Sequence, residues 1–139
     1  MIFLDSDVMI DILRQFPPAI NWFDNLDDEE EIVLSGFVFM ELIQGCKNKL
    51  EQEKLQIELA TYEIKWPSPE NCDEAINLFI QYHLSHHVGL LDVLAQTAVE
   101  LGVPLYTFNQ KHYQVVPYLQ TRQPYQKQSP KPVDNTALP

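Results

Sequence analysis

Three acidic side chains stand in apolar surroundings, where carboxylates are uncommon. Asp5 directly follows an apolar run, and Glu41 and Asp92 each interrupt an apolar segment. Any one of them could cap a helix or pair with a buried base. Brought together in a cleft of low dielectric constant, however, they would repel one another and would either take up protons or require a cation.

The cation that such a set would select is a hard divalent ion. Carboxylate oxygens favour magnesium or manganese over zinc. One or two such ions polarise a phosphodiester, lower the pKa of a bound water and steady the leaving oxygen. The residue types therefore indicate metal-assisted hydrolysis of a phosphodiester.

The elements that would position these residues alternate along the chain. Hydrophobic periodicity, caps and prolines predict strands over residues 2–5, 32–34, 64–66 and 105–108, and helices over 6–13, 18–26, 35–45, 50–62, 69–85 and 91–101. Alternating strands and helices of this kind predict an α/β fold, a sandwich of helices around a mostly parallel sheet.

The chemistry-bearing residues are expected at one edge of that sheet. Asp5 falls at the end of the first strand, where Ser6 is expected to cap the following helix. Asp92 falls at the start of a helix, and Asn109 comes just past the last strand. In an open α/β sheet, ligands bind beyond the carboxyl ends of the strands where the strand order reverses. We therefore expect these side chains to reach one crevice.

Composition narrows the class of protein. The chain has 139 residues, with 20 Asp and Glu against 9 Lys and Arg, giving a formal charge of −11. That length predicts one domain. The acidity argues against a nucleic-acid binder that works by general phosphate attraction, but not against an enzyme that meets phosphates through bound cations. Four scattered glycines build no phosphate-cradling loop.

The ends of the chain and its cysteines indicate where it works. The N-terminus lacks the basic start and apolar core of a signal peptide, and no apolar run is long enough for a membrane span. With two cysteines and no secretion signal, a reducing cytoplasm is expected. We predict one folded domain, the nuclease domain, over residues 1–122 and a loosely ordered, proline-rich tail over residues 123–139.

Several short segments stand in a recognisable order. They are Leu4–Arg14, Pro17–Ala19, Ser35 with Glu41-Leu42 and Gly45, Asp92–Ala98, Leu105–Tyr113 and Pro124-Tyr125. Together they closely resemble the PIN-domain ribonucleases, in particular the VapC-type toxins of bacterial toxin–antitoxin pairs. Each segment alone is a weak indication, whereas the set in this order is specific. The resemblance implies a three-layer α/β/α PIN-like domain.

The resemblance also implies an activity and a set of site residues. Asp5, Glu41 and Asp92 match the three acidic metal ligands of a magnesium-dependent endoribonuclease, in which Mn²⁺ could replace Mg²⁺. Asn109 falls where family members carry Asp or Asn. Its amide oxygen adds no negative charge, so the resemblance does not decide whether a second metal ion binds. Thr107 and Ser6 match hydroxyl positions that orient ligands.

The implied partners are an RNA substrate, a cognate antitoxin and a second copy of the chain. Residues 1–31 carry nine acidic side chains and one basic side chain, a net −8. We therefore expect the antitoxin segment that enters the cleft to be basic or to carry an arginine.

Two other functions are compatible with parts of the sequence. A PIN-like module without catalysis, acting only through protein partners, would explain the amide at Asn109 and the overall acidity. The pattern Asp5-Ser6-Asp7 also resembles the haloacid dehalogenase phosphatases, whose first Asp is the nucleophile. That family requires a later lysine followed by an acidic pair, whereas no acid follows Lys111 until Asp134. Asp7 is therefore expected to support the site residues without binding the ion itself, or to complement the dipole at the helix start.

Overall fold

The computed structural model describes residues 1–86 and 92–127, except for the side chains of residue 86 and residues 92–94. The strands are β1 (Ile2–Leu4), β2 (Ile32–Ser35), β3 (Glu63–Lys65), β4 (Leu105–Tyr106) and β5 (Thr121–Arg122). The helices are α1 (Ser6–Leu13), α2 (Pro17–Asp24), α3 (Gly36–Gln44), α4 (Lys49–Leu59), α5 (Pro69–His86), α6 (Asp92–Leu101) and the short 3₁₀ helix η1 (His112–Val115).

The five strands form one sheet in the order β3-β2-β1-β4-β5, and every pairing is parallel. β1 is central, with Phe3 opposite both Val33 of β2 and Leu105 of β4. The chain adds β2 and β3 on one side of β1 and then returns to add β4 and β5 on the other. The strand order thus reverses between β1 and β4, which is where an α/β sheet opens a crevice at its carboxyl edge.

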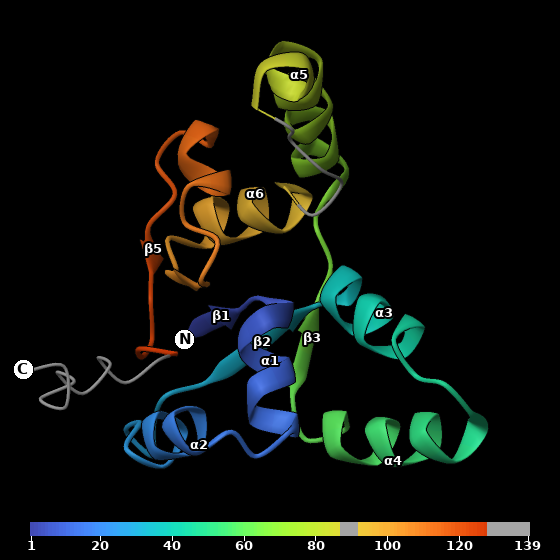
Figure 1. Cartoon of the computed structure of the whole chain (residues 1–139). Coiled ribbons are helices and arrows are strands. Elements are labelled where there is room, and N and C mark those ends of the chain that lie inside the picture. Colours follow the sequence, from blue (N-terminus) through green and yellow to red (C-terminus); the bar gives the residue numbers. More distant parts are fainter. Residues whose placement is uncertain (87–91, 128–139) are drawn as a thin grey trace, which may run out of the picture.

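Helices cover the sheet, as Figure 1 shows: α5 and α6 lie above the strands in this view, and α2 and α4 lie below them. The central strand β1 is buried on both faces, which explains why it is an uninterrupted apolar run. Fully buried side chains from strands and helices meet in one core, among them Phe3, Leu34, Leu105, Val8, Met9 and Val38. Each contributes roughly 1.5–3 kcal/mol by leaving water.

The predicted α/β fold is confirmed, and its local signals explain most of the element ends. Pro17 and Pro18 occupy the first turn of α2, where a missing N–H costs nothing. The Ser35 side chain accepts a hydrogen bond from Phe37 N and caps α3. Gly102, with φ +64°, follows α6 in the left-handed conformation that glycine adopts most easily.

The cap of α1 differs from the prediction by one residue. Asp5, and not Ser6, is the N-cap: its backbone is extended (φ −75°, ψ 162°) and its side chain accepts from Ser6 N. Ser6 is the first helical residue. Asp5 therefore ends β1 and starts α1 at once, which fixes its backbone from both sides.

The C-terminal region contains structure that the sequence did not predict. β5 pairs with β4 through only two residues, and η1 lies between them along the chain. Residues 123–127 belong to the segment expected as a tail, yet Tyr125 packs against the core. The remainder of that segment, residues 128–139, lies outside the described part of the chain. Among the described helices, none combines the length and apolarity that crossing a membrane requires.

Candidate active site

Asp5 is a buried carboxylate that accepts hydrogen bonds from three donors. Only 5% of the residue is exposed. Its Oδ1 accepts from Ser6 N at 2.8 Å, and its Oδ2 accepts from the hydroxyls of Thr107 at 2.8 Å and Tyr113 at 3.0 Å. A buried charge is tolerated when it is hydrogen-bonded in this way. The donors come from α1, from the end of β4 and from η1, so three elements fix one side chain.

Thr107 lies at this point because β1 and β4 are neighbours. Asp5 N donates to Tyr106 O at 3.0 Å, and the ladder brings the next residue, Thr107, level with the carboxylate. Thr107 is fully buried. The hydroxyl role that the sequence assigns to Thr107 is thus matched by a direct contact, whereas Ser6 reaches Asp5 through its backbone N–H.

Asp7 lies beside Asp5 and accepts two backbone hydrogen bonds. Its Oδ1 accepts from Val8 N at 2.7 Å and its Oδ2 accepts from Phe108 N at 3.0 Å. Burial raises the pKa of Asp7 to about 6, and the neighbouring charge of Asp5 raises this pKa as well, against the opposing effects of the two N–H groups and Lys127. The carboxylates of Asp5 and Asp7 are therefore close enough, at the carboxyl edge of β1, for the charge of one to affect the other.

A signal for this was present in the sequence. The spacing Asp5-Ser6-Asp7 places both acids at one strand-to-helix junction, so neither can move far from the other. Acids in the first turn of a helix ordinarily complement the helix dipole, and the sequence pattern alone does not reveal that Asp7 is half-buried.

For the other three predicted site residues, Glu41, Asp92 and Asn109, the structure gives no side-chain contact with Asp5 among the described residues. Asn109 is exposed in the turn after β4, and its backbone N donates to Thr107 Oγ1 at 3.0 Å. Glu41 is exposed on α3 and lines a groove between α1, α3 and α4. Asp92 is the first residue of α6, as expected, but its side chain lies outside the described part of the structure.

The donor set of the site suits a hard cation in part. Asp5 and Asp7 supply carboxylate oxygens whose mutual repulsion a cation would relieve. In the described part of the chain, no group of three or more His, Cys, Asp or Glu side chains is placed to hold a metal ion. A fuller ligand set therefore requires Asp92 or Glu41 in addition to the pair at the start of α1.

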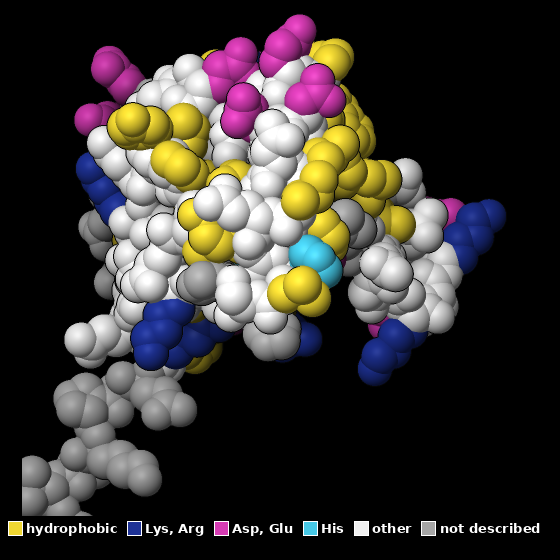
Figure 2. Space-filling model, turned by 90° about the horizontal axis from the view of Figure 1, so that it is seen from above, with side chains coloured by type: hydrophobic (Ala, Val, Ile, Leu, Met, Phe, Trp, Pro, Cys, Tyr) yellow, Lys and Arg dark blue, Asp and Glu magenta, His cyan; other side chains and the backbone are white. Residues whose placement is uncertain are grey.

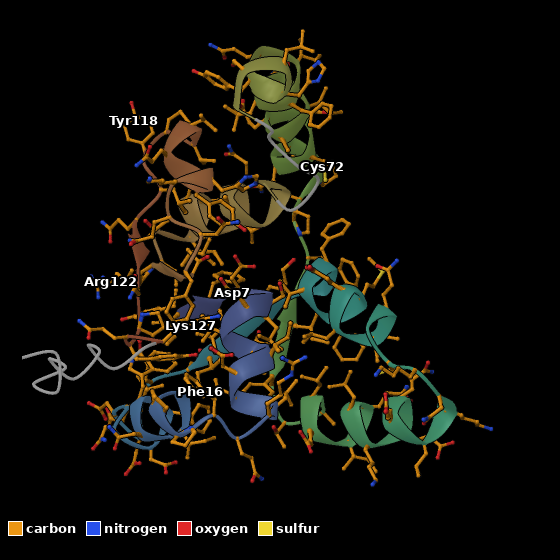
Figure 3. The ribbon with its side chains drawn as sticks, viewed as in Figure 1. Asp7, Phe16, Cys72, Tyr118, Arg122 and Lys127 are labelled. Atoms are coloured by element: carbon orange, nitrogen blue, oxygen red, sulfur yellow. The ribbon has the colours of Figure 1, made fainter. Side chains whose placement is uncertain are left out.

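Lys127, in the described part of the C-terminal segment, lies beside the acids of α1. Lys127 Nζ is 3.4 Å from Asp11 Oδ2 and 4.4 Å from the centre of the Phe108 ring. Figure 3 shows Lys127 and Asp7 on the same side of the molecule, near the start of α1. The Tyr125 hydroxyl also donates to Asp11 Oδ2, at 2.8 Å. Burial and Asp11 together raise the pKa of Tyr125, so its phenol stays protonated.

Comparison with known proteins identifies the family. The family model of the PIN domain matches residues 2–116, and the chain belongs to the PIN-domain family. The haloacid dehalogenase alternative receives no support from this match. A search of curated proteins found no significant match.

Solved structures with the same fold include toxin–antitoxin complexes. A toxin–antitoxin complex from Klebsiella pneumoniae is 20% identical with a TM-score of 0.71, over 90% of this chain and 98% of that chain. VapBC2 from Rickettsia felis, bound to a DNA fragment from its promoter, is 25% identical with a TM-score of 0.71, over 88% and 98%. VapBC-1 from nontypeable Haemophilus influenzae is 21% identical with a TM-score of 0.69, over 88% and 97%. The predicted resemblance to VapC-type PIN proteins is confirmed.

Proposed function

We propose that this protein is a metal-dependent endoribonuclease and the toxin of a toxin–antitoxin pair. The observation that carries the proposal is the junction of β1 and α1, where Asp5 and Asp7 raise the local negative charge at the carboxyl edge of a PIN fold. The resemblance to solved toxin–antitoxin complexes supports the biological role.

In this proposal, Asp5, Glu41, Asp92 and Asn109 hold Mg²⁺, or Mn²⁺ in its place. A bound ion would supply Lewis-acid chemistry, since it would polarise the scissile phosphodiester and lower the pKa of a water. The chain supplies the orientation. Thr107 and the Ser6 N–H hold the Asp5 carboxylate, and the Asn109 amide offers an oxygen without charge. The positive charge of Lys127 partly offsets the negative potential around Asp7, which eases the approach of an RNA backbone.

The test is cleavage of RNA by the purified protein with and without divalent metal. We expect cleavage in Mg²⁺, loss of cleavage on chelation, and loss of at least about a hundredfold in rate in Asp5→Asn. Asp24→Asn, at an exposed position on α2, removes the same charge and should retain the rate. Cleavage that persists in chelator, or in Asp5→Asn, would contradict the proposal.

The groove between α1, α3 and α4 is our proposed docking site for the antitoxin. It has a volume of about 530 Å³. Its apolar lining includes Ile10, Leu13, Leu42 and Leu55, and acidic and basic side chains flank it. An amphipathic helix places its apolar face into a groove of this kind.

Co-expression with the product of the adjacent gene tests this docking site. Leu55→Ala, in the groove, should weaken the complex, whereas Ile57→Ala, at an exposed position of the same helix, should not. Equal affinity of the two variants would place the antitoxin elsewhere.

A homodimer is proposed as well. Exposed apolar side chains at helical spacing form a stripe on α5, namely Ile76, Phe79, Ile80 and Leu84. Figure 2 views the molecule from the side of α5 and shows hydrophobic side chains gathered on that face. Exposed apolar stripes of this kind mark association surfaces. The molar mass in solution, with Ile80→Lys as the disrupting variant, tests this.

The second candidate function is a PIN-like binding module without catalysis. The amide at Asn109, in place of an acid, and the net charge of −11 favour it. Metal titration separates the two functions, because the binding module predicts no measurable affinity for Mg²⁺ or Mn²⁺ at neutral pH. Measurable affinity, abolished in Asp5→Asn, favours the nuclease.

A further inference from the structure

Tyr113 makes a contact with Asp5 that the proposed mechanism does not use. The residue is 3% exposed and belongs to η1, and its hydroxyl donates to Asp5 Oδ2 at 3.0 Å. We propose that Tyr113 is a positioning residue that holds the Asp5 carboxylate in its cation-binding orientation. This inference rests on the proposed function, because it assumes that Asp5 binds the ion.

The hydrogen bonds of Asp5 define which oxygen remains available. A carboxylate has about four acceptor sites, two on each oxygen. The hydroxyls of Thr107 and Tyr113 fill both sites on Oδ2, and Ser6 N fills one on Oδ1. These bonds fix the rotation of the carboxylate, and they leave the open site on Oδ1. Without the Tyr113 hydroxyl, Oδ2 would regain an open site and the carboxylate could turn.

Tyr113 also closes a ring of contacts that includes Asn109. Asn109 N donates to Thr107 Oγ1, and Asn109 O accepts from His112 N at 3.0 Å, at the start of η1. The next residue, Tyr113, then returns to Asp5. Thr107 and Tyr113 therefore clamp Oδ2 from the two ends of one loop, and Asn109 lies between them. Among the described residues, removing the phenol hydroxyl would leave the Thr107 hydroxyl as the side-chain link between this loop and Asp5.

The chain offers a matched control for this hydroxyl. The Tyr125 hydroxyl donates to Asp11 Oδ2 at 2.8 Å, so Tyr125→Phe removes the same kind of bond from another carboxylate of the α1 region. Both substitutions keep the ring and its packing. They differ in which carboxylate loses a donor.

The experiment measures Mn²⁺ binding by electron paramagnetic resonance, with no RNA present. We expect Tyr113→Phe to weaken Mn²⁺ affinity by roughly tenfold, as is typical when a hydrogen bond to a metal ligand is removed. Tyr125→Phe should bind Mn²⁺ as the unaltered protein does, and Asp5→Asn should lose binding. Circular dichroism checks that each variant is folded at the temperature of the titration.

The outcomes separate this inference from the proposed function. Unchanged affinity in Tyr113→Phe overturns the positioning role and leaves the nuclease proposal intact. Equal weakening in the two tyrosine variants also overturns it, because the effect would then be a general loosening of the fold. No Mn²⁺ binding by the unaltered protein removes the metal mechanism together with this inference.

A second measurement applies if Tyr113→Phe does not fold. Tyrosine labelled with ¹³C at Cζ gives six resonances in the unaltered protein. On addition of Mg²⁺, the Tyr113 resonance should shift, because its hydroxyl donates to the same Asp5 carboxylate that would bind the ion. The Tyr125 resonance should stay in place. A Tyr113 resonance that does not respond while Mg²⁺ binds would refute the role.

Discussion

The charge of Asp7 should oppose folding at neutral pH, and Asp7→Asn tests this. Burial, and then the Asp5 carboxylate, raise the pKa of Asp7 from 3.8 to about 6. The unfolded chain therefore releases this proton at lower pH than the folded chain. The stability that the protonated form gives is complete below pH 3.8, and it is lost as the pH rises through about 6.

The size of the effect follows from the shift. A pKa change of roughly two units corresponds to about 3 kcal/mol. Asp7 is only partly buried, so solvent screening reduces this to about 1–2 kcal/mol. Asparagine keeps the shape and one oxygen for the N–H of Val8 or Phe108, but it cannot ionise. Asp7→Asn should thus be more stable than the unaltered protein by about 1–2 kcal/mol at pH 7.5 and should gain nothing at pH 3.5.

Urea unfolding at the two pH values measures this difference. The control is Asp28→Asn, which removes an acid from an exposed position of the same N-terminal region. A loss of stability in Asp7→Asn of similar size at both pH values would refute the reasoning, because it would show that the hydrogen bonds of the carboxylate outweigh its charge. Magnesium should narrow the gap at pH 7.5 by stabilising the protein that retains both carboxylates.

Two further predictions concern the surroundings of the site. Lys127→Met removes the ammonium that lowers the pKa of Asp7, so this pKa should rise further above its ordinary value, as followed by ¹³C NMR of the carboxyl carbon; an unchanged pKa would show that Lys127 lies too far away to matter. Gly36→Ala places a Cβ where the indole of Trp66 lies, and since Trp66 is 58% exposed, the ring should swing into solvent with a cost of no more than about 1 kcal/mol. Tryptophan emission in a Trp22→Phe background should shift to longer wavelength, and an unshifted spectrum would contradict this.

The sequence predicted the strands and helices well because their signals are local. The apolar run of β1, the prolines of α2 and the serine before α3 each act within a few residues. The location of Asp5 at a strand end followed from the same signals. Its burial and its contact with Thr107 follow from parallel pairing of β1 with β4, which the alternation of elements implies.

The features that the sequence did not predict depend on contacts between distant segments. Asp7 accepts a hydrogen bond from Phe108 N, which lies 101 residues away in the sequence. Tyr125 lies in a proline-rich region that has the composition of a tail. Its hydroxyl nevertheless donates to Asp11, which lies 114 residues away in the sequence. β5 is two residues long, too short for periodicity to show. Such contacts become visible only when the strand order is known.

The three acids at the start of the chain show why residue type alone does not define a site. Asp5 is satisfied by three donors, and Asp11 has a tyrosine hydroxyl and a lysine. Asp7 has two N–H donors, yet burial and Asp5 still make its charge unfavourable. A cation bound beside Asp5 would therefore gain most from Asp7, the acid with the least compensation. For that reason we expect Asp7→Asn to weaken metal binding while it strengthens the folded protein, a combination that a purely structural carboxylate would not produce.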